Sequence, residues 1–332
     1  MKNIEEFLAF AHSLADRARL VMAECLSGPI SFETKGDQSP VTVVDQAIER
    51  ALREMIAQRY PGHGILGEEY DSEKLDAEYV WVIDPIDGTK AFITGIPVFG
   101  TLIALTRGGY PIIGIIDHPA TDDRWAGAEG QQSTHNGTPI SVRDCGSLGE
   151  AIVTNSSPEM LDPYESAAFE RVKAATKWRV YGGSCYVYGR LAMGRIDVSV
   201  DSGLDPFDYC ALDAVIRGAG GVITDWAGER LSIRSGHRVL AAGSAKLHEE
   251  LIKILGGSAP SGVVWRGGAP PASITSCAYA KSPSRPGRNQ AARRRRVRAR
   301  PWSPGAQRPA AFRSRQGKKW SIRRGCSGTG LR

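Results

Sequence analysis

The chain has 332 residues, with 42 Lys and Arg, 36 Asp and Glu and a formal net charge of +6, which is enough length for a sizeable core or for a core with an appendage. All 36 acidic residues precede position 258, so residues 1–257 hold 24 basic against 36 acidic residues, a net charge of −12, whereas residues 258–332 carry +18. The acidic part offers no electrostatic reason to bind nucleic acid. No stretch approaches the roughly 20 apolar residues of a membrane-spanning helix, so we expect a soluble protein.

Two amphipathic helices are predicted at the start of the chain. Apolar residues recur at helical spacing over residues 4–26 and again over about 45–60. Glu5 and Glu6 replace the continuous apolar run of a secretion signal. The six cysteines contain no Cys-x-x-Cys pair, and a reducing cytoplasm is the simplest compartment for such a chain.

Short β-branched runs broken by Gly and Pro then alternate with helical patterns. We predict strands at residues 79–83, 101–106, 112–116, 151–154, 196–200, 222–224 and 239–242. We predict helices at residues 163–176, 185–193, 207–219 and 246–255, the third of them ended by Gly220 and Gly221. This alternation predicts one layered α/β domain over residues 1–256.

The last part of the chain, residues 257–332, has a different composition. It is rich in Arg, Pro, Gly, Ala and Ser and includes four consecutive arginines at 293–296. Without apolar periodicity, no core would offset the entropy lost on ordering, so we predict a disordered basic tail. Its basic residues are 15 Arg and 3 Lys, with no acidic residue, a bias that we interpret as a frame-shifted reading of a GC-rich gene. The intact mass of the protein from its native source tests this interpretation.

Two segments contain acidic residues that could bind one metal site together. Glu68 and Glu69 form one, and Asp84 and Asp87 form the other, after a predicted strand. A proline turn after Asp84 would let the two aspartates converge, with the Ile86 carbonyl between them. Glu68 would add a further oxygen, and Mg²⁺ binds through oxygen ligands. Alone, Asp-Pro is most often a turn and Glu-Glu a solvated patch, but the combination predicts a metal site that activates water against a phosphate.

Three segments together resemble the inositol-monophosphatase family, whose members are lithium-sensitive, Mg²⁺-dependent phosphomonoesterases. Residues 67–69 and 84–89 resemble its two N-terminal signatures, and residues 206–212 with 219–222 resemble its third. The resemblance spans nearly all of residues 1–256. It implies an α/β fold, a layered αβαβα sandwich of the inositol-monophosphatase and fructose-1,6-bisphosphatase type, and it makes a homodimer the expected assembly.

The resemblance also implies which residues hold metal. Glu68, Asp84 and the Ile86 carbonyl would hold an activating ion, and Asp84, Asp87 and Asp208 would hold a second. Glu68 would bind a weaker third ion. We therefore expect two or three Mg²⁺ per site.

Three further residues are implicated around the phosphate. Gly88 permits close approach of the backbone, and a helix beginning after it would point free N–H groups at the anion. Thr89 would orient the attacking water together with Glu68. Residues 35–45 also resemble the family, which implies that Asp45 supports Thr89 in this catalytic role. The alternative for Asp45 is helix capping.

The bacterial histidinol-phosphatase subgroup is the part of the superfamily that the chain resembles most. The segments that carry this likeness are residues 95–105, 116–119, 124–125, 136–139 and 182–186. It implies cleavage of L-histidinol phosphate in histidine biosynthesis. The substrate would be contacted by six residues: Asp87, Gly88, Thr89, Ser184, Asp201 and Asp208.

Two positions depart from that subgroup and keep other substrates open. Ser184 stands where an Asp is usual, and Asp201 stands where a Glu is usual. Asp201 would suit the ammonium of histidinol phosphate, but losing one charge-assisted contact costs about 1.5–3 kcal/mol. Inositol 1-phosphate is the leading alternative, and 3′-phosphoadenosine phosphates are another. A different class of function is nucleic-acid binding through the basic tail.

Overall fold

The computed structural model describes residues 2–25, 32–34 and 40–256 and arranges them in alternating helical and sheet layers. The helices are α1 (Lys2–Cys25), α2 (Val43–Arg59), α3 (Thr89–Thr94), α4 (Pro163–Ala175), α5 (Ser184–Ala192), α6 (Pro206–Gly218) and α7 (Ala245–Leu255), with 3₁₀ turns η1 (Leu148–Glu150) and η2 (Pro158–Met160). The strands are β1 (Phe32–Thr34), β2 (Pro40–Thr42), β3 (Gly64–Gly67), β4 (Tyr79–Asp87), β5 (Gly100–Arg107), β6 (Tyr110–His118), β7 (Asp123–Ala128), β8 (Thr134–His135), β9 (Thr138–Pro139), β10 (Ile152–Asn155), β11 (Trp178–Tyr181), β12 (Val198–Asp201), β13 (Val222–Thr224) and β14 (Val239–Ala242).

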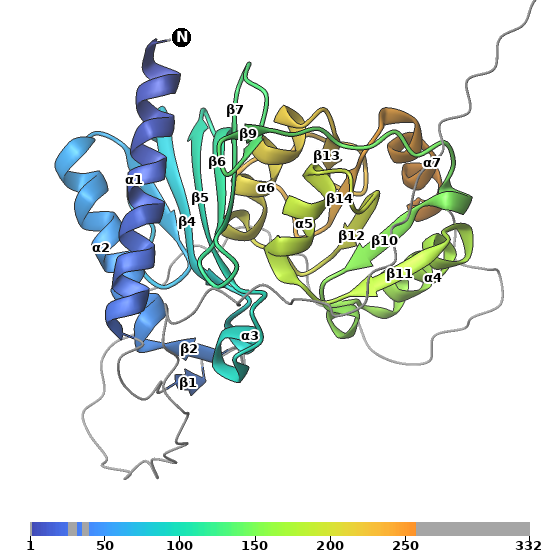
Figure 1. The fold of residues 1–332 in the computed structure, drawn as a ribbon, viewed down its shortest axis with the longest axis horizontal. Coiled ribbons are helices and arrows are strands. Elements are labelled where there is room, and N and C mark those ends of the chain that lie inside the picture. Colours follow the sequence, from blue (N-terminus) through green and yellow to red (C-terminus); the bar gives the residue numbers. More distant parts are fainter. Residues whose placement is uncertain (1, 26–31, 35–39, 257–332) are drawn as a thin grey trace, which may run out of the picture.

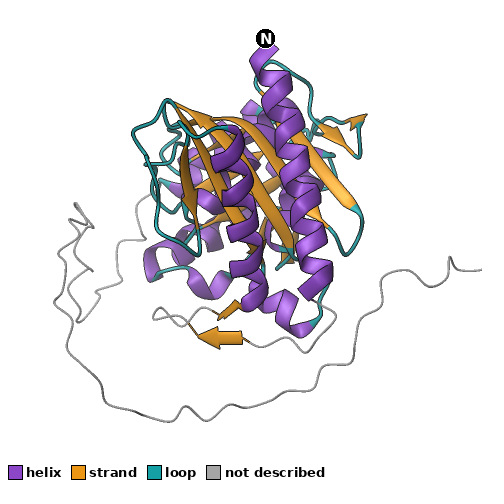
Figure 2. Ribbon diagram, turned by 90° about the vertical axis from the view of Figure 1, so that its left-hand side faces the viewer, coloured by secondary structure: helices purple, strands orange, loops and turns teal. Residues whose placement is uncertain are grey.

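Two sheets form the frame of the molecule. The larger has the order β3-β4-β5-β6-β7-β8-β9, and the smaller has the order β11-β10-β12-β14-β13. Figure 1 shows α1 and α2 outside the larger sheet, α5 and α6 between the sheets, and α4 and α7 outside the smaller one. In Figure 2, α1 and α2 lie side by side across the larger sheet. The predicted αβαβα sandwich is therefore confirmed.

Strand β4 shows how the alternating pattern builds two cores. Trp81 and Ile83 point to the core shared with α1 and α2. Val80 and Val82 point the other way, to the core that contains α5 and α6, as the two-residue period of a strand requires. A third core lies between the smaller sheet and the outer helices α4 and α7.

Helix α6 lies unusually close to the larger sheet. A Cβ atom on Gly114 would lie 2.1 Å from the Ala211 carbonyl oxygen, and one on Gly127 would lie 2.4 Å from the Ala214 carbonyl oxygen. These two glycines therefore let the helix backbone rest directly on strands β6 and β7. This contact fixes α6 against the larger sheet.

The predicted elements are mostly confirmed, with two kinds of error. Helices and strands appear close to their predicted bounds, and Gly220, at φ +86°, follows the end of α6 as expected. Strand β4 extends to Asp87 instead of ending before a proline turn. Strands β1, β2, β7, β8, β9 and β11 were not predicted. All four residues of β11 are exposed, so no buried face marks it in the sequence.

The remaining expectations concern other parts of the chain. The tail predicted over residues 257–332, with its disorder and frame-shift interpretation, lies outside the described residues. Within the described ranges, no helix combines the length and apolar character needed to cross a membrane.

Candidate metal and phosphate site

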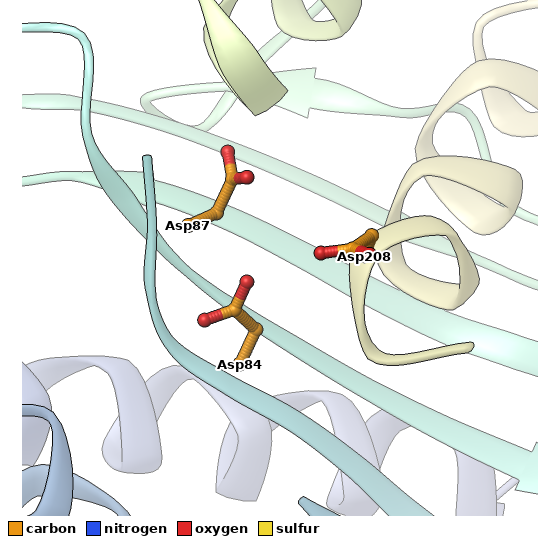
Figure 3. A group of neighbouring side chains, drawn as sticks. All are labelled: Asp84, Asp87 and Asp208. Atoms are coloured by element: carbon orange, nitrogen blue, oxygen red, sulfur yellow. The ribbon is translucent and has the colours of Figure 1, made fainter. Parts of the chain in front are cut away.

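Three carboxylates converge where β4 ends and α6 begins. Oxygen atoms of Asp84, Asp87 and Asp208 all lie within 4.8 Å of one another. Figure 3 shows the two β4 side chains and the α6 side chain directed at a common space. The structure thus brings together three of the predicted metal ligands from positions more than 120 residues apart.

A β-bulge explains how two residues of one strand share a face. Asp84 pairs with Leu102 and Asp87 with Gly100, so β4 has one more residue than β5 between these pairs. In a regular strand, residues three apart point to opposite faces, and the extra residue of a bulge corrects this. The Thr101 hydroxyl donates a 2.8 Å hydrogen bond to the Pro85 carbonyl and fastens the irregular segment. The carboxylates therefore converge through a bulge inside a strand, which corrects the expected turn.

Helix α6 supplies the third carboxylate from its first turn. Asp205 and Asp208 form a capping box, in which the Asp205 N–H donates a 2.7 Å hydrogen bond to Asp208 Oδ2. Pro206 occupies the first turn, where its missing N–H costs nothing. One Asp208 oxygen is thus held by its own helix.

Asp87 is oriented by the opposite half of the chain. The Cys185 N–H, in the first turn of α5, donates a 2.6 Å hydrogen bond to Asp87 Oδ2. Ser184 precedes it with a left-handed φ of +46°. The Ser184 hydroxyl oxygen lies 2.9 Å from the position that a Cβ on Gly88 would take. The predicted residues Ser184 and Gly88 are therefore neighbours beside the acidic cluster.

Glu68 reaches the cluster from the adjacent strand. Strands β3 and β4 are parallel, with Gly67 paired to Ile83, so the next residues along the two strands, Glu68 and Asp84, emerge side by side. The charge of Glu68 acts on the pKa of Asp84, Asp87 and Asp208. All four predicted carboxylate ligands therefore belong to one electrostatic cluster.

Burial and mutual repulsion raise the pKa values in this cluster. Burial is the main cause that raises the pKa of Asp84 well above its ordinary value, and the charge of Glu68 adds to it. Burial also raises the pKa of Asp208, with the charge of Asp87 as the next cause. For Asp87, burial raises the pKa to about 6 although hydrogen bonds from Cys185 oppose the shift.

The cluster has the properties of a site for a hard divalent cation. The ligand atoms are carboxylate oxygens, the donors that Mg²⁺ prefers. Asp84 is 1% exposed, and its Oδ1 has no hydrogen-bond partner. A buried carboxylate oxygen without a partner is costly, and a cation between these groups would offset both the burial and the repulsion. The residues present therefore fit such an ion.

The turn after Asp87 leads into the short helix α3. Gly88 has φ +82° and is the N-cap of α3, which begins at Thr89. The predicted helix start after Gly88 is confirmed. The Thr89 hydroxyl donates a 3.0 Å hydrogen bond to the Ile86 carbonyl, so the hydroxyl and the carbonyl expected at the site also meet.

Asp45 and Thr89, the pair expected to activate water, each have another hydrogen-bond partner within the described residues. Asp45 lies in a capping box at the start of α2, where its Oδ2 accepts hydrogen bonds from the N–H and the hydroxyl of Thr42. Thr89 instead bonds to Ile86. Asp45 thus takes part in helix capping as the third helical residue of α2, with Thr42 as the N-cap, and its support of Thr89 stays a prediction. Asp45 Oδ1 has no partner, and Asp45 lies near enough to Glu68 for that charge to raise its pKa, after burial.

Asp201 is buried and hydrogen-bonded within the protein. It is 2% exposed, and its Oδ2 accepts hydrogen bonds from the hydroxyls of Tyr188 at 2.6 Å and Ser199 at 2.9 Å. Its Oδ1 accepts a 2.6 Å hydrogen bond from the Ser156 N–H. Both oxygens are thus engaged by the protein, and the contact of Asp201 with a substrate ammonium stays a prediction. Its charge still contributes to the raised pKa of Asp87.

Two groups at the site were not predicted. The Cys185 N–H that holds Asp87 is a backbone group, which residue types do not reveal. Glu49, which bonds to the turn after Glu68, lies one helical turn beyond Asp45 on α2. The sequence signal for Glu49 was an acidic residue four positions after Asp45, on the face of an amphipathic helix that is expected to be buried.

Comparisons with known proteins agree with this geometry. The sequence model of the inositol monophosphatase family matches residues 3–258. A bifunctional phosphatase IMPL2 from Arabidopsis thaliana chloroplasts is 41% identical over 262 residues, 76% of each chain. A histidinol-phosphatase of Mycobacterium tuberculosis is 35% identical over 231 residues, 67% of this chain and 88% of that one. A solved inositol monophosphatase of Zymomonas mobilis is 37% identical, with a TM-score of 0.70 over 76% of this chain and 98% of that one.

Proposed function

Because the chain belongs to the inositol monophosphatase family, we propose that it hydrolyses a small phosphomonoester, L-histidinol phosphate, with Mg²⁺ held by the acidic cluster. Members of the family are phosphatases, generally metal-dependent, that act on small phosphate esters. The observation that carries the proposal is the convergence of Asp84, Asp87 and Asp208 within 4.8 Å.

Five residues would hold the metal ions. Asp84, Asp87, Asp208 and Glu68 offer carboxylates, and Ile86 offers its carbonyl oxygen, to two or three Mg²⁺. When bound, these ions neutralise phosphate charge and lower the pKa of a water molecule. The hydrogen bonds to Asp87 and Asp208 fix the direction of each carboxylate before any ion arrives, as preorganised sites require.

The chain's own polar groups would then place the phosphate and the water. Gly88 brings the backbone close to the phosphate, and Thr89 and Glu68 would orient the attacking water. Ser184, beside Gly88, would contact the ester oxygen or the leaving alcohol. The unpartnered Oδ1 of Asp45 would accept a hydrogen bond from water in the site.

Histidinol phosphate is proposed on sequence similarity rather than on a formed ammonium pocket. The histidinol-phosphatase of Mycobacterium tuberculosis is among the relatives, and its name supports this substrate. Ser184 favours inositol 1-phosphate as the second candidate, because a serine adds no negative charge to attract an ammonium. A 3′-phosphoadenosine phosphate remains a third candidate, since it would use the same metal cluster.

A substrate panel tests the proposal. Phosphate release would be measured from histidinol phosphate, inositol 1-phosphate, fructose 1,6-bisphosphate and 3′-phosphoadenosine 5′-phosphate, with Mg²⁺ and with added Li⁺. We expect the highest kcat/KM for histidinol phosphate, and inhibition by Li⁺. A higher kcat/KM for inositol 1-phosphate would replace the substrate, and no turnover of any ester would refute the proposed activity.

We also propose a cytoplasmic homodimer. The edge strand β11 exposes Trp178 by 59% and Tyr181 by 50%, an apolar surface suited to a second copy. Cys25, Cys145, Cys185 and Cys210 are free thiols, in keeping with a reducing compartment. Light scattering after size exclusion tests the dimer.

Salt-sensitive nucleic-acid binding that disappears on truncation after Leu255 would instead support a function of the basic tail.

A further inference from the structure

Glu49 is a buried carboxylate that lies next to the cluster without belonging to it. It is on α2 and is fully buried, with an exposed fraction of 0%. Its Oε2 accepts a 2.8 Å hydrogen bond from the Glu69 N–H, and its Oε1 accepts one of 2.8 Å from Arg53 Nε. Burial raises the pKa of Glu49, and these bonds, together with one from the Tyr70 N–H, oppose that shift. Glu49 therefore binds the backbone directly after Glu68.

Arg53 also binds the segment that follows Glu68. Besides Glu49, its guanidinium donates to the Tyr70 carbonyl at 3.1 Å and to the Glu73 carboxylate at 3.0 Å. Helix α2 thus receives hydrogen bonds from this backbone through Glu49 and donates hydrogen bonds to it through Arg53. We call Glu49 and Arg53 the α2 clamp.

The residue before Glu68 is also fitted to the clamp. A Cβ atom on Gly67 would lie 2.0 Å from Glu49 Oε1, closer than any real contact, so only glycine allows the carboxylate to lie where it does. Glu68 is therefore flanked by one residue packed against Glu49 and another hydrogen-bonded to it. Its freedom to move away from Asp84 is restricted on both sides.

A stabilising role alone explains this arrangement poorly. Burying a carboxylate is costly, and even with an arginine partner a buried ion pair is often no better than apolar packing. What an apolar side chain cannot supply is a directed acceptor for the Glu69 N–H. Groups that orient metal ligands in this way commonly alter metal affinity when they are removed.

We propose that Glu49 is a positioning residue, which fixes Glu68 for the metal ions through the Glu69 N–H. This inference deepens the proposed function and rests on it. It predicts that loss of Glu49 weakens metal binding, whereas the chemical step recovers when metal is in excess. Glu49 itself touches neither the ions nor the substrate.

The test uses the full-length protein and Mn²⁺, whose free concentration is read by electron paramagnetic resonance. Glu49→Gln keeps the shape and one acceptor but loses one of the two contacts, and Glu49→Ala loses both. We expect the Mn²⁺ dissociation constant to rise roughly 10-fold to 100-fold, more for Ala than for Gln. With Mn²⁺ in the assay, kcat at saturating metal should return close to the wild-type value.

Asp197→Asn is the matched control. Asp197 is 1% exposed, binds Arg143 through both oxygens and accepts a 2.8 Å hydrogen bond from the Ile152 N–H, but it lies at the opposite end of β12 from Asp201. We expect this variant to lower Tm and to leave Mn²⁺ affinity unchanged. Wild-type affinity in both Glu49 variants, or an equal loss in Asp197→Asn, would overturn the positioning role. Wild-type protein that binds no Mn²⁺ would instead refute the proposed function.

Discussion

The Cys185 N–H donates a 2.6 Å hydrogen bond to Asp87 Oδ2, so a helix between the two sheets orients a carboxylate on the larger sheet. The donor is a backbone group, and the Cys185 thiol also forms a hydrogen bond that lowers the pKa of Asp87. Packing between α5 and β4 is thereby coupled to the geometry of the metal cluster.

Removing that N–H should weaken metal binding. Cys185→Pro deletes the donor in the first turn of α5, whereas Cys185→Ala keeps the donor and loses only the thiol. A hydrogen bond to a charged group contributes about 1.5–3 kcal/mol, so the Mg²⁺ concentration for half-maximal rate should rise about 10-fold to 100-fold for Pro. The measurement is the rate as a function of Mg²⁺. An equal effect of Cys185→Ala would show that the thiol matters instead.

Asp87 should make the metal-free protein sensitive to pH. Burial raises its pKa from an ordinary 3.8 to about 6 in the folded state. A raised folded pKa means that its contribution to stability is complete below the unfolded value and is lost as the pH rises through about 6. In EDTA, Asp87→Asn should therefore have nearly the wild-type Tm at about pH 4 and a higher one at about pH 7. A Tm difference that does not change with pH would contradict this assignment.

Gly88 should be required for activity, because a side chain there would meet close neighbours and because its φ is left-handed. A Cβ there would lie 2.9 Å from the Ser184 hydroxyl and 3.1 Å from the Val98 carbonyl, at φ +82°. Gly95, at the other end of α3, has φ +75° and open space around it. We expect Gly88→Ala to lower kcat/KM roughly 100-fold. Gly95→Ala should cost about 1–2 kcal/mol of stability and little activity. Equal kinetics in the two variants would show that the contacts of Gly88 are unimportant.

Ser184 should control which leaving alcohol is preferred. Its left-handed φ of +46° suits aspartate better than most residues, and Ser184→Asp would place a charge beside Gly88. If that charge meets the ammonium of histidinol phosphate, the ratio of kcat/KM for histidinol phosphate to that for inositol 1-phosphate should rise about 10-fold. Ser184→Asn tests the same backbone without the charge. A rise of the same size with Asn would exclude an electrostatic cause.

The fold was largely predictable because its cores are periodic. Strand β4 alternates between two cores, and the apolar stripe of α2 faces one of them, so both patterns are visible in the sequence. The exposed strand β11 has no such pattern and was missed. Strand β11 is defined by its pairing with β10, and a single sequence does not show which strands pair.

The site was predictable in its ligands and less so in its connections. Asp84 and Asp87 were identified from residue type and spacing and Asp208 from the family resemblance, and the structure brings the three together. The hydrogen bonds of Asp45 with Thr42 and of Asp201 with Tyr188 were not predicted. A side chain's choice among nearby hydrogen-bond partners depends on distances of a few ångströms, which sequence alone does not provide.

Mg²⁺-dependent release of phosphate from histidinol phosphate by wild type and Asp84→Asn tests the central claim most directly. We expect turnover by the wild type that EDTA abolishes and Mg²⁺ restores. Asp84→Asn should show no turnover while its Tm in EDTA equals or exceeds that of the wild type, because a neutral side chain removes both the cost of burying a charge and the repulsion from Glu68, which raise the pKa of Asp84. Hydrolysis at the wild-type rate by Asp84→Asn, or by the wild type in EDTA, would contradict the account.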